Sequence, residues 1–205
     1  MHLLDRLNVY LFHYNRLKKW SGNFSKIQGW SSDQSQHARF KVIESATDFH
    51  QRSVLDLGCG YAELYDYLSK NHQLAAYTGV DQQHQFLKAA KKRLANESKV
   101  CHFVRRDISQ FSMKNVDVVV ASGSLNYQSR DPEYLTKIIN RMYQMANETV
   151  IFNLLDSSTF PKQTLLAGYN KKGTLFYCKT LCPNVELIED YANEDFTIVM
   201  RKQAK

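Results

Sequence analysis

The stretch Ser53-Val54-Leu55-Asp56-Leu57-Gly58-Cys59-Gly60-Tyr61-Ala62-Glu63 decides the fold. Its first half is a short apolar run typical of a buried strand, and two glycines, Gly58 and Gly60, then open an amphipathic helix. Glycine permits a sharp backbone turn, and the missing Cβ lets a ligand approach the main chain closely. The order of strand, glycine turn and helix therefore predicts a binding site for a nucleotide-like cofactor at the turn.

Acidic residues around this turn indicate which cofactor it binds. A dinucleotide fingerprint needs a third glycine where the pyrophosphate meets the helix, and here Glu63 stands at that position. Asp56, at the end of the strand, adds a second carboxylate. Carboxylates repel phosphates but attract cations, and S-adenosylmethionine carries a sulfonium and an ammonium and no phosphate. The turn therefore favours S-adenosylmethionine over NAD.

Two further acidic residues follow predicted strands at the expected spacing. The segment 75–81 ends in Asp81, whose carboxylate can accept hydrogen bonds from both hydroxyls of a ribose. The segment 100–105 leads to Asp107, which can accept from an adenine amino group, and to Ile108, which can cover the ring. These positions predict how the nucleoside part of the cofactor is held.

Other segments complete the predicted sheet. Residues 115–121 are β-branched and continuous, as expected for a strand buried on both faces. They run into the small turn 122–124 at the carboxyl edge of the sheet, where ligands bind in open α/β folds. Residues 149–155 predict a fifth strand, and 185–191 with 196–201 predict an antiparallel hairpin.

In this combination the chain resembles class I S-adenosylmethionine-dependent methyltransferases of the small bacterial type. The matching motifs are Val54–Tyr61, Gly79–Asp81, Arg106–Ile108 and Val118–Gly123. One departure is Ala62, where many members have a further glycine. The resemblance implies an α/β fold: a doubly wound, mostly parallel seven-stranded sheet with a C-terminal antiparallel hairpin. It also implies S-adenosylmethionine as cofactor and S-adenosylhomocysteine as product.

The resemblance extends to the segment before the first strand, because small bacterial members place a Gln and an Arg over the methionine end of the cofactor. It implies the following cofactor-binding residues: Trp30, Gln36, Arg39, Asp56, Gly58, Cys59, Gly60, Tyr61, Asp81, Gln82, Asp107, Ile108, Ala121, Ser122 and Leu125. No metal site is expected, since the cysteines lack paired zinc spacing and the histidines are scattered.

Two parts of the chain are distinguished by pattern. Residues 1–50 are predicted to form an N-terminal helical lid or extension, and residues 51–205 the S-adenosylmethionine-binding methyltransferase domain. Residues 1 to about 20 carry Leu3, Leu4, Leu7 and Leu11 at helical intervals, and Asp33 could cap a second helix running to about residue 49. A lid over the cofactor and a helix that only packs on the sheet both remain open for the first helix.

The turn after the fourth strand restricts the methyl acceptor by exclusion. The sequence Ala121-Ser122-Gly123-Ser124 lacks the Asn/Asp-Pro motif typical of adenine or glutamine methylation, and it lacks the carboxylate of metal-dependent catechol methylation. The remaining reaction is direct transfer of the methyl group from the sulfonium to an oxygen or nitrogen of a small molecule. Alignment and desolvation of the two reactants suffice for this reaction. Tyr127, Asn126 and His37 are candidates for the acceptor pocket, and the catalytic residue stays open.

Charge and length leave two alternatives. The net charge of +7 and basic clusters such as Lys91-Lys92-Arg93 would suit an RNA methyltransferase, although a solvated helix face or attraction of an anionic small substrate explains them better. The second alternative is a protein that binds S-adenosylmethionine as a sensor or scaffold without catalysis.

The 205 residues suit one α/β domain as a monomer or homodimer. Because no apolar run reaches membrane-spanning length and no signal peptide is visible, a cytoplasmic location without a membrane partner is expected.

Overall fold

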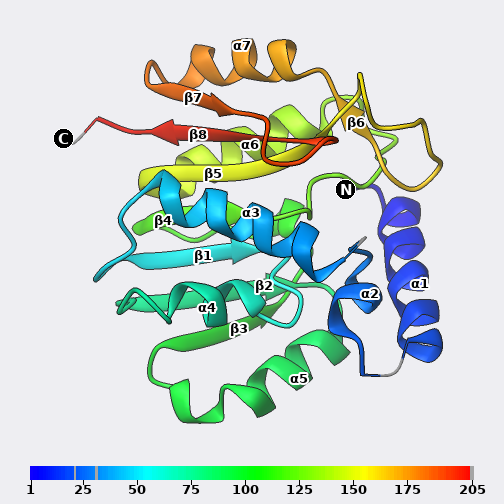
Figure 1. The fold of residues 1–205 in the computed structure, drawn as a ribbon, viewed down its shortest axis with the longest axis vertical. Coiled ribbons are helices and arrows are strands. Elements are labelled where there is room, and N and C mark those ends of the chain that lie inside the picture. The colour runs from blue at the N-terminus through cyan, green and yellow to red at the C-terminus, as the bar shows by residue number, and fades with distance from the viewer. Residues whose placement is uncertain (21, 31, 204–205) are drawn as a thin grey trace.

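A central sheet with helices on both faces forms the body of the protein in the computed structural model, which describes residues 1–20, 22–30 and 32–203 (Figure 1). The strands are β1 (Ser53–Leu57), β2 (Ala76–Asp81), β3 (Cys101–Arg105), β4 (Val116–Ala121), β5 (Ala146–Asp156), β6 (Gly168–Tyr169), β7 (Val185–Ile188) and β8 (Asp195–Arg201). The α-helices are α1 (Leu3–Lys19), α2 (Phe24–Gln28), α3 (Asp33–Ala46), α4 (Glu63–Leu68), α5 (His84–Arg93), α6 (Tyr134–Met145) and α7 (Lys171–Leu181).

The sheet has the predicted doubly wound topology, with strand order β3-β2-β1-β4-β5-β8-β7. Strands β1 to β5 are parallel, and β8 runs antiparallel to both β5 and β7, which confirms the terminal hairpin. Within the described residues β6 adds an eighth strand beside β5; its two residues are too few to give a sequence pattern. The strand order reverses between β1 and β4, which places a ligand crevice at their carboxyl ends.

The β-branched run of β4 explains why the sheet is buried on both faces. Side chains alternate along a strand, so Val119 packs in the cluster that includes α6 and α7, while Val118 and Val120 pack in the cluster formed by α3, α4 and α5. All three valines are fully buried. The two clusters fix the sheet between two helical layers and leave its carboxyl edge to be covered by other segments.

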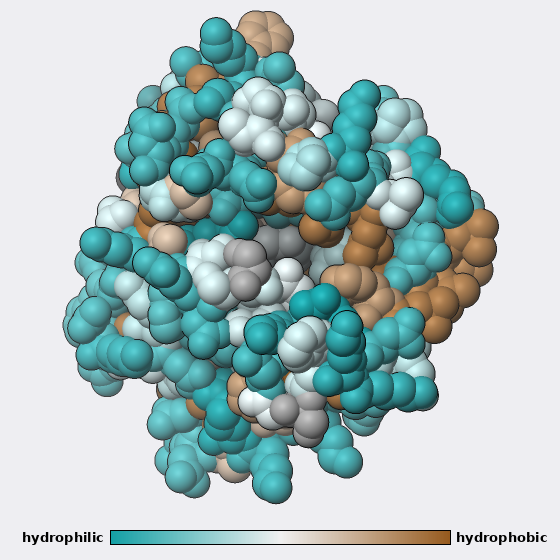
Figure 2. Space-filling view, turned by 45° about the vertical axis from the view of Figure 1, so that its right-hand side comes forward, coloured by the Kyte–Doolittle hydropathy of each residue, from teal (hydrophilic) through white to brown (hydrophobic). Residues whose placement is uncertain are grey.

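Helix α1 lies beside the carboxyl edge of the central strands (Figure 1). The helical period was predicted correctly, but the leucines do not form its packing face, because the buried residues are Asp5, Val9 and His13. The outward residues Leu3, Leu4, Leu7 and Leu11 are 72%, 49%, 47% and 44% exposed. They account for the hydrophobic patch on the right-hand side of Figure 2, where α1 lies.

Polar contacts hold this helix on the body. The carboxylate of Asp5 accepts a hydrogen bond from the backbone N–H of Arg130 at 2.8 Å and pairs with its guanidinium at 2.9 Å.

Helix α3 begins one residue earlier than the sequence suggested, because Ser32 and not Asp33 is its N-cap. The Ser32 hydroxyl accepts a hydrogen bond from the Ser35 N–H at 3.1 Å. The proposed boundary at residue 50 falls between α3 and β1 and stays a prediction.

In the part of the chain that the structure describes, none of the helices combines the length and the apolar character needed to cross a bilayer.

Candidate active site

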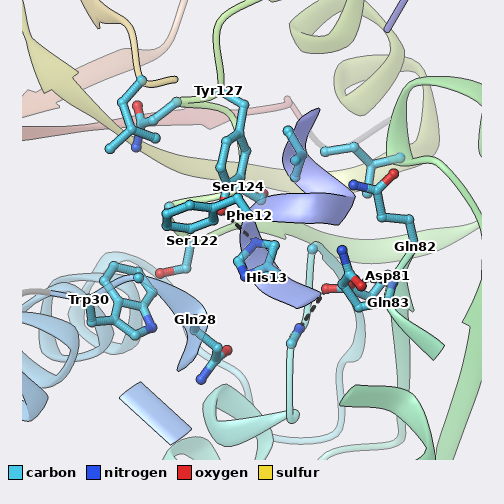
Figure 3. Close-up of a pocket in the computed structure, with 18 of the residues that line it drawn as sticks. Phe12, His13, Gln28, Trp30, Asp81, Gln82, Gln83, Ser122, Ser124 and Tyr127 are labelled. Atoms are coloured by element: carbon cyan, nitrogen blue, oxygen red, sulfur yellow. Dashed lines mark hydrogen bonds between the residues drawn. The ribbon is translucent and has the colours of Figure 1, made fainter. Parts of the chain in front are cut away.

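A cavity of about 210 Å³ opens at the carboxyl ends of β1, β2, β3 and β4. Its floor comes from the loops that follow these strands, and its roof comes from α1 and from the segment after α2 (Figure 3). Gln28, the last residue of α2, and Trp30 pack against the turns after β1 and β4: a Cβ on Gly60 would overlap Gln28, and a Cβ on Gly123 would meet the Trp30 ring. The glycines therefore make room for the N-terminal segment as well as for a ligand.

The glycine turn has the sharp backbone geometry that the sequence predicted. Gly58 and Gly60 have φ of +82° and +55°, in the left-handed region that favours glycine. The N–H groups of Gly58 and Cys59 both donate to the Val80 carbonyl, at 2.7 and 3.1 Å, and so tie the turn to β2. Ala62, which replaces a family glycine, also lies at a φ of +60°. Alanine at this position therefore keeps the backbone shape of the turn, at some cost in backbone strain.

Asp81 is the best-placed predicted ligand for a ribose. One of its carboxylate oxygens accepts from the Gly60 N–H at 3.0 Å and the other from the Gln83 N–H at 2.8 Å (Figure 3). A carboxylate has about four lone-pair positions, so these bonds fix the group and leave capacity for a ligand. Burial raises the pKa of Asp81 to about 6, against the opposing effect of the backbone hydrogen bonds.

Asp107 and Ile108 line the same cavity, beyond the end of β3. Asp107 Oδ1 accepts from the N–H and the hydroxyl of Ser109, both at 2.9 Å. Asp107 Oδ2 lies 3.2 Å from Arg6 Nε of α1 but has no hydrogen-bond partner. One oxygen thus shapes the loop, while the other forms ion pairs with Arg6 and with the N-terminal ammonium, 3.8 Å away, and keeps lone pairs for a ligand.

Asp56 and Glu63, which favoured a cationic ligand in the sequence, lie outside this cavity. Burial raises the pKa of Asp56 to about 7, and its Oδ2 accepts from the Tyr77 hydroxyl at 2.6 Å. Glu63 accepts from the side-chain amides of Gln28 and Gln36, the latter at 2.8 Å. Both carboxyls line a separate small cavity of about 20 Å³ and are bonded to protein groups. In this structure both carboxyls therefore face protein groups, and a role of Asp56 in cofactor binding stays a prediction.

We expect Tyr77→Phe to lower the free energy of unfolding by about 1 to 2 kcal/mol, because the fully buried Asp56 carboxyl loses its hydrogen bond. Urea unfolding monitored by circular dichroism measures this change. Tyr177→Phe is the matched control: it removes a hydroxyl that donates to the half-buried carbonyl of Thr136, which water can replace, so a change below about 0.5 kcal/mol is expected. Equal losses in the two variants would contradict a structural role for the Asp56 bond.

The structure brings most of the predicted site residues to the main cavity. These are Trp30, Arg39, Gly58, Gly60, Asp81, Gln82, Asp107, Ile108, Ser122, Asn126 and Tyr127. Gln36, Asp56 and Cys59 line the small cavity instead. Tyr61, Ala121 and Leu125 are buried in the packing around the site, Tyr61 between the rings of Phe24 and Phe86.

His37, a predicted acceptor-pocket residue, lies away from the cavity. It is on the exposed side of α3, and its ring centroid is 6.0 Å from that of Tyr67. It lines neither the main cavity nor the small one beside it. The helical period of α3 explains this position, since Gln36 and Arg39 are buried and the residue following Gln36 points away. A role of His37 in binding the acceptor stays a prediction.

Arg39 links the roof to the body. Its guanidinium pairs with Asp195 of β8 at 2.6 Å and lies 4.5 Å from the centroid of the Trp30 ring. Arg39 Nε and Trp30 Nε1 are both buried donors without a hydrogen-bond partner. Two unused donors at this side of the cavity are available to an anionic or hydrogen-bond-accepting group of a ligand.

His13 of α1 is a site residue that the sequence reasoning missed. Its Nε2 lies 2.8 Å from the Tyr127 hydroxyl, and its Nδ1 lies 3.2 Å from the Ile27 carbonyl. Burial lowers the pKa of His13 to about 4. The signal was present as a four-residue spacing of Asp5, Val9 and His13, but the leucines on the opposite face dominate the pattern. Among the described residues no cluster of three or more His, Cys, Asp or Glu side chains could hold a metal ion.

Comparison with known proteins identifies the family of this chain. A family model described as a methyltransferase domain matches residues 54–148. The protein "Putative methyltransferase Rv1506c" of Mycobacterium tuberculosis is 32% identical over 173 residues, which cover 79% of this chain and 98% of that protein. The chain therefore belongs to the class I S-adenosylmethionine-dependent methyltransferases, and S-adenosylmethionine is its cofactor.

Solved structures show the same fold at lower identity. Magnesium protoporphyrin IX methyltransferase from Synechocystis PCC 6803, with bound SAH, has a TM-score of 0.70 and 13% identity, covering 97% of this chain and 100% of that chain. A structure described as a putative S-adenosylmethionine-dependent methyltransferase from Listeria monocytogenes has a TM-score of 0.66 and 16% identity, covering 82% and 99%. Membership of the methyltransferase family, shown by the family model and the Mycobacterium tuberculosis relative, sets the sensor or scaffold alternative aside in favour of an enzyme.

Proposed function

We propose that this methyltransferase transfers a methyl group to an oxygen or nitrogen atom of a small molecule by direct displacement. One observation carries the proposal: buried polar atoms without hydrogen-bond partners gather at one cavity. Of the eight such side-chain atoms among the described residues, six belong to residues that line it: Trp30 Nε1, Arg39 Nε, Gln83 Oε1, Asp107 Oδ2, Ser122 Oγ and Tyr134 Oη. Buried polar groups are rarely left unpaired, so this cavity is built for a polar ligand.

The chemistry of these atoms fits the cofactor in one orientation. Hydrogen-bond acceptors, Asp81, Gln83 Oε1 and Asp107 Oδ2, follow β2 and β3 and suit the ribose hydroxyls and the adenine amino group. Donors, Trp30 Nε1 and Arg39 Nε, belong to residues that line the cavity on the side of the N-terminal segment, and they suit a carboxylate such as that of the methionine part. In this proposal Gly58, Gly60 and Ser122 lie along the middle of the cofactor.

The protein contributes alignment and exclusion of water. When bound, the cofactor supplies a methyl carbon that is already activated by its sulfonium, so a nucleophile held in line needs little further catalysis. Val9, Phe12 and Phe86 give the cavity an apolar lining on the α1 side. Because α1 and Trp30 roof the cavity, a small acceptor fits better than a folded RNA.

Cofactor affinity is expected to depend on pH through Asp81. Its pKa of about 6 means that the ionised form predominates above pH 6, and this form both accepts from ribose hydroxyls and attracts a cationic ligand. Affinity should level off as the pH rises to about 7 and fall by up to about tenfold per pH unit below pH 6, since the ligand's α-carboxyl and α-amino groups titrate outside pH 5 to 7. Calorimetric titrations at stepped pH measure this. A flat profile from pH 5 to 7 would contradict the assignment.

The acceptor class is tested with methyl-labelled S-adenosylmethionine and a cell extract divided into RNA, protein and small-molecule fractions. The proposal predicts that enzyme-dependent label appears in the small-molecule fraction and resists ribonuclease. Label confined to RNA would overturn the proposal and favour the RNA methyltransferase. Label confined to protein would overturn it as well.

A further inference from the structure

A hydrogen-bonded pair joins the roof of the cavity to its floor. Tyr127, in the loop after β4, and His13, from α1, point toward one another with their hydroxyl and Nε2 atoms 2.8 Å apart (Figure 3). Their ring centroids lie 5.8 Å apart in an edge-on arrangement. Both side chains line the cavity. The direction of this hydrogen bond decides what the Tyr127 hydroxyl offers to a ligand.

The other nitrogen of His13 sets that direction. Nδ1 faces the Ile27 carbonyl at 3.2 Å, and a carbonyl can only accept, so Nδ1 carries the proton. With its pKa lowered to about 4 by burial, the ring is neutral at pH 7 and Nε2 has a free lone pair. The Tyr127 hydroxyl must therefore donate its one proton to Nε2.

Tyr127 is left as a hydrogen-bond acceptor toward the cavity. Burial, with the nearby charge of Asp81, raises the pKa of Tyr127, so the phenol keeps its proton. That proton is engaged with His13, and only lone pairs of the oxygen remain for a ligand. An N–H or O–H group satisfies them, whereas a carboxylate, which has only lone pairs at pH 7, does not.

Apolar side chains line the cavity on one side of the pair. Leu166 forms a β-bridge with Tyr127, and the Phe12 ring lies 5.1 Å from the ring of His13. Leu166, Phe12 and Phe160 line the cavity together with Tyr127. This side of the cavity therefore combines an apolar wall with the Tyr127 hydroxyl oxygen, an acceptor whose direction is fixed. It fits a ligand that is apolar except for a single hydrogen-bond donor group.

We infer that Tyr127, oriented by His13, binds the reacting group of the methyl acceptor, and that this group is the amine or hydroxyl of an apolar, aromatic-sized molecule rather than a carboxylate. The inference rests on the proposed function and narrows its acceptor class. To bind a carboxylate, the Tyr127 hydroxyl would have to turn away from His13 and leave the buried Nε2 unpaired. That loss makes carboxylates on the order of 10- to 100-fold weaker ligands.

The pair also gives the departing proton a route. As the acceptor's lone pair bonds to the methyl carbon, the carbon–sulfur bond breaks and its electron pair stays on sulfur. The acceptor's N–H or O–H proton passes to Tyr127 Oη, while Tyr127 passes its own proton to His13 Nε2. Because the pKa of His13 is about 4, the imidazolium then releases the proton to solvent. Atoms and charge balance without a further reagent.

Three probes with the same apolar body test the inference: 4-ethylphenol, 4-ethylaniline and 4-ethylbenzoate, each titrated into the protein saturated with S-adenosylhomocysteine. We expect saturable binding of the phenol and the aniline, and binding of the benzoate at least about tenfold weaker. Tyr127→Phe should weaken the phenol and the aniline about tenfold without weakening the benzoate. Leu7→Gln, on the exposed face of α1, is the control and should bind all three as the parent does.

The variant His13→Ala distinguishes two roles of His13: orienting the Tyr127 hydroxyl, and holding α1 in place. This variant frees the Tyr127 proton, so the benzoate should bind more tightly than to the parent and the discrimination should shrink. If His13 only held α1 in place, the variant would weaken all three probes alike, and that result would overturn the inference. No binding of any probe, or equal binding of all three to the parent, would overturn it too. Failure of S-adenosylhomocysteine to bind at all would instead contradict the proposed function.

Discussion

Gly58→Ala is expected to lower the free energy of unfolding by about 2 to 5 kcal/mol. A φ of +82° costs a residue with a Cβ about 1 to 2 kcal/mol, and the new Cβ would overlap the side chain and approach the backbone of Ser124 in the turn after β4. Relieving that overlap in a packed site adds about 1 to 3 kcal/mol. Urea unfolding of the purified variant measures the loss.

Gly22→Ala is the matched control for this change. Gly22 has nearly the same φ, +80°, but nothing lies within 4 Å of the position a Cβ would take. The backbone cost is therefore shared, and the difference between the variants isolates the contact with Ser124. A difference of about 1 to 3 kcal/mol is expected. Equal losses would contradict the close packing of the first glycine turn against the turn after β4.

Asp81→Ala is expected to weaken S-adenosylmethionine binding by about 1 to 3 kcal/mol, roughly 10- to 100-fold, because ribose hydroxyls lose a charged, buried acceptor. The Gly60 N–H also loses its partner, so the turn that faces the cofactor becomes less fixed. Calorimetric titration at pH 7.5 measures the change. At this pH the parent carboxyl is ionised.

The exposed Asp33 on α3 supplies the control. Asp33→Ala removes the same charge at a site outside the cavity and should leave the affinity unchanged within about twofold, since exposed charges are screened. Unchanged affinity in Asp81→Ala would contradict the assignment of Asp81 to the ribose. Equal weakening in both variants would mean that net charge alone governs binding.

Much of the body could be predicted from local sequence. The β-branched valines of β4 favour a strand, and the glycines after β1 allow the positive φ that the turn needs, so both elements are readable from the local sequence. Asp81 follows a strand at a fixed spacing, and the topology then brings it to Gly60. The sequence identified these residues because backbone geometry, and little else, determines where they lie.

The remaining errors concern side-chain direction and long-range contacts. The leucines of α1 gave the correct period but the wrong face, because Asp5 and His13 are buried by polar partners more than 100 residues away. The hydrogen bond of Asp56 with Tyr77 of the neighbouring strand was not foreseen either. Such pairings follow from the tertiary structure and leave no local pattern.

Calorimetric titration of the protein with S-adenosylmethionine, with NAD in parallel, tests the central claim most directly. The account predicts saturable micromolar binding of S-adenosylmethionine at one site, no binding of NAD, and loss of most of that affinity in Asp81→Ala. Absence of S-adenosylmethionine binding, or equal binding of NAD, would contradict it.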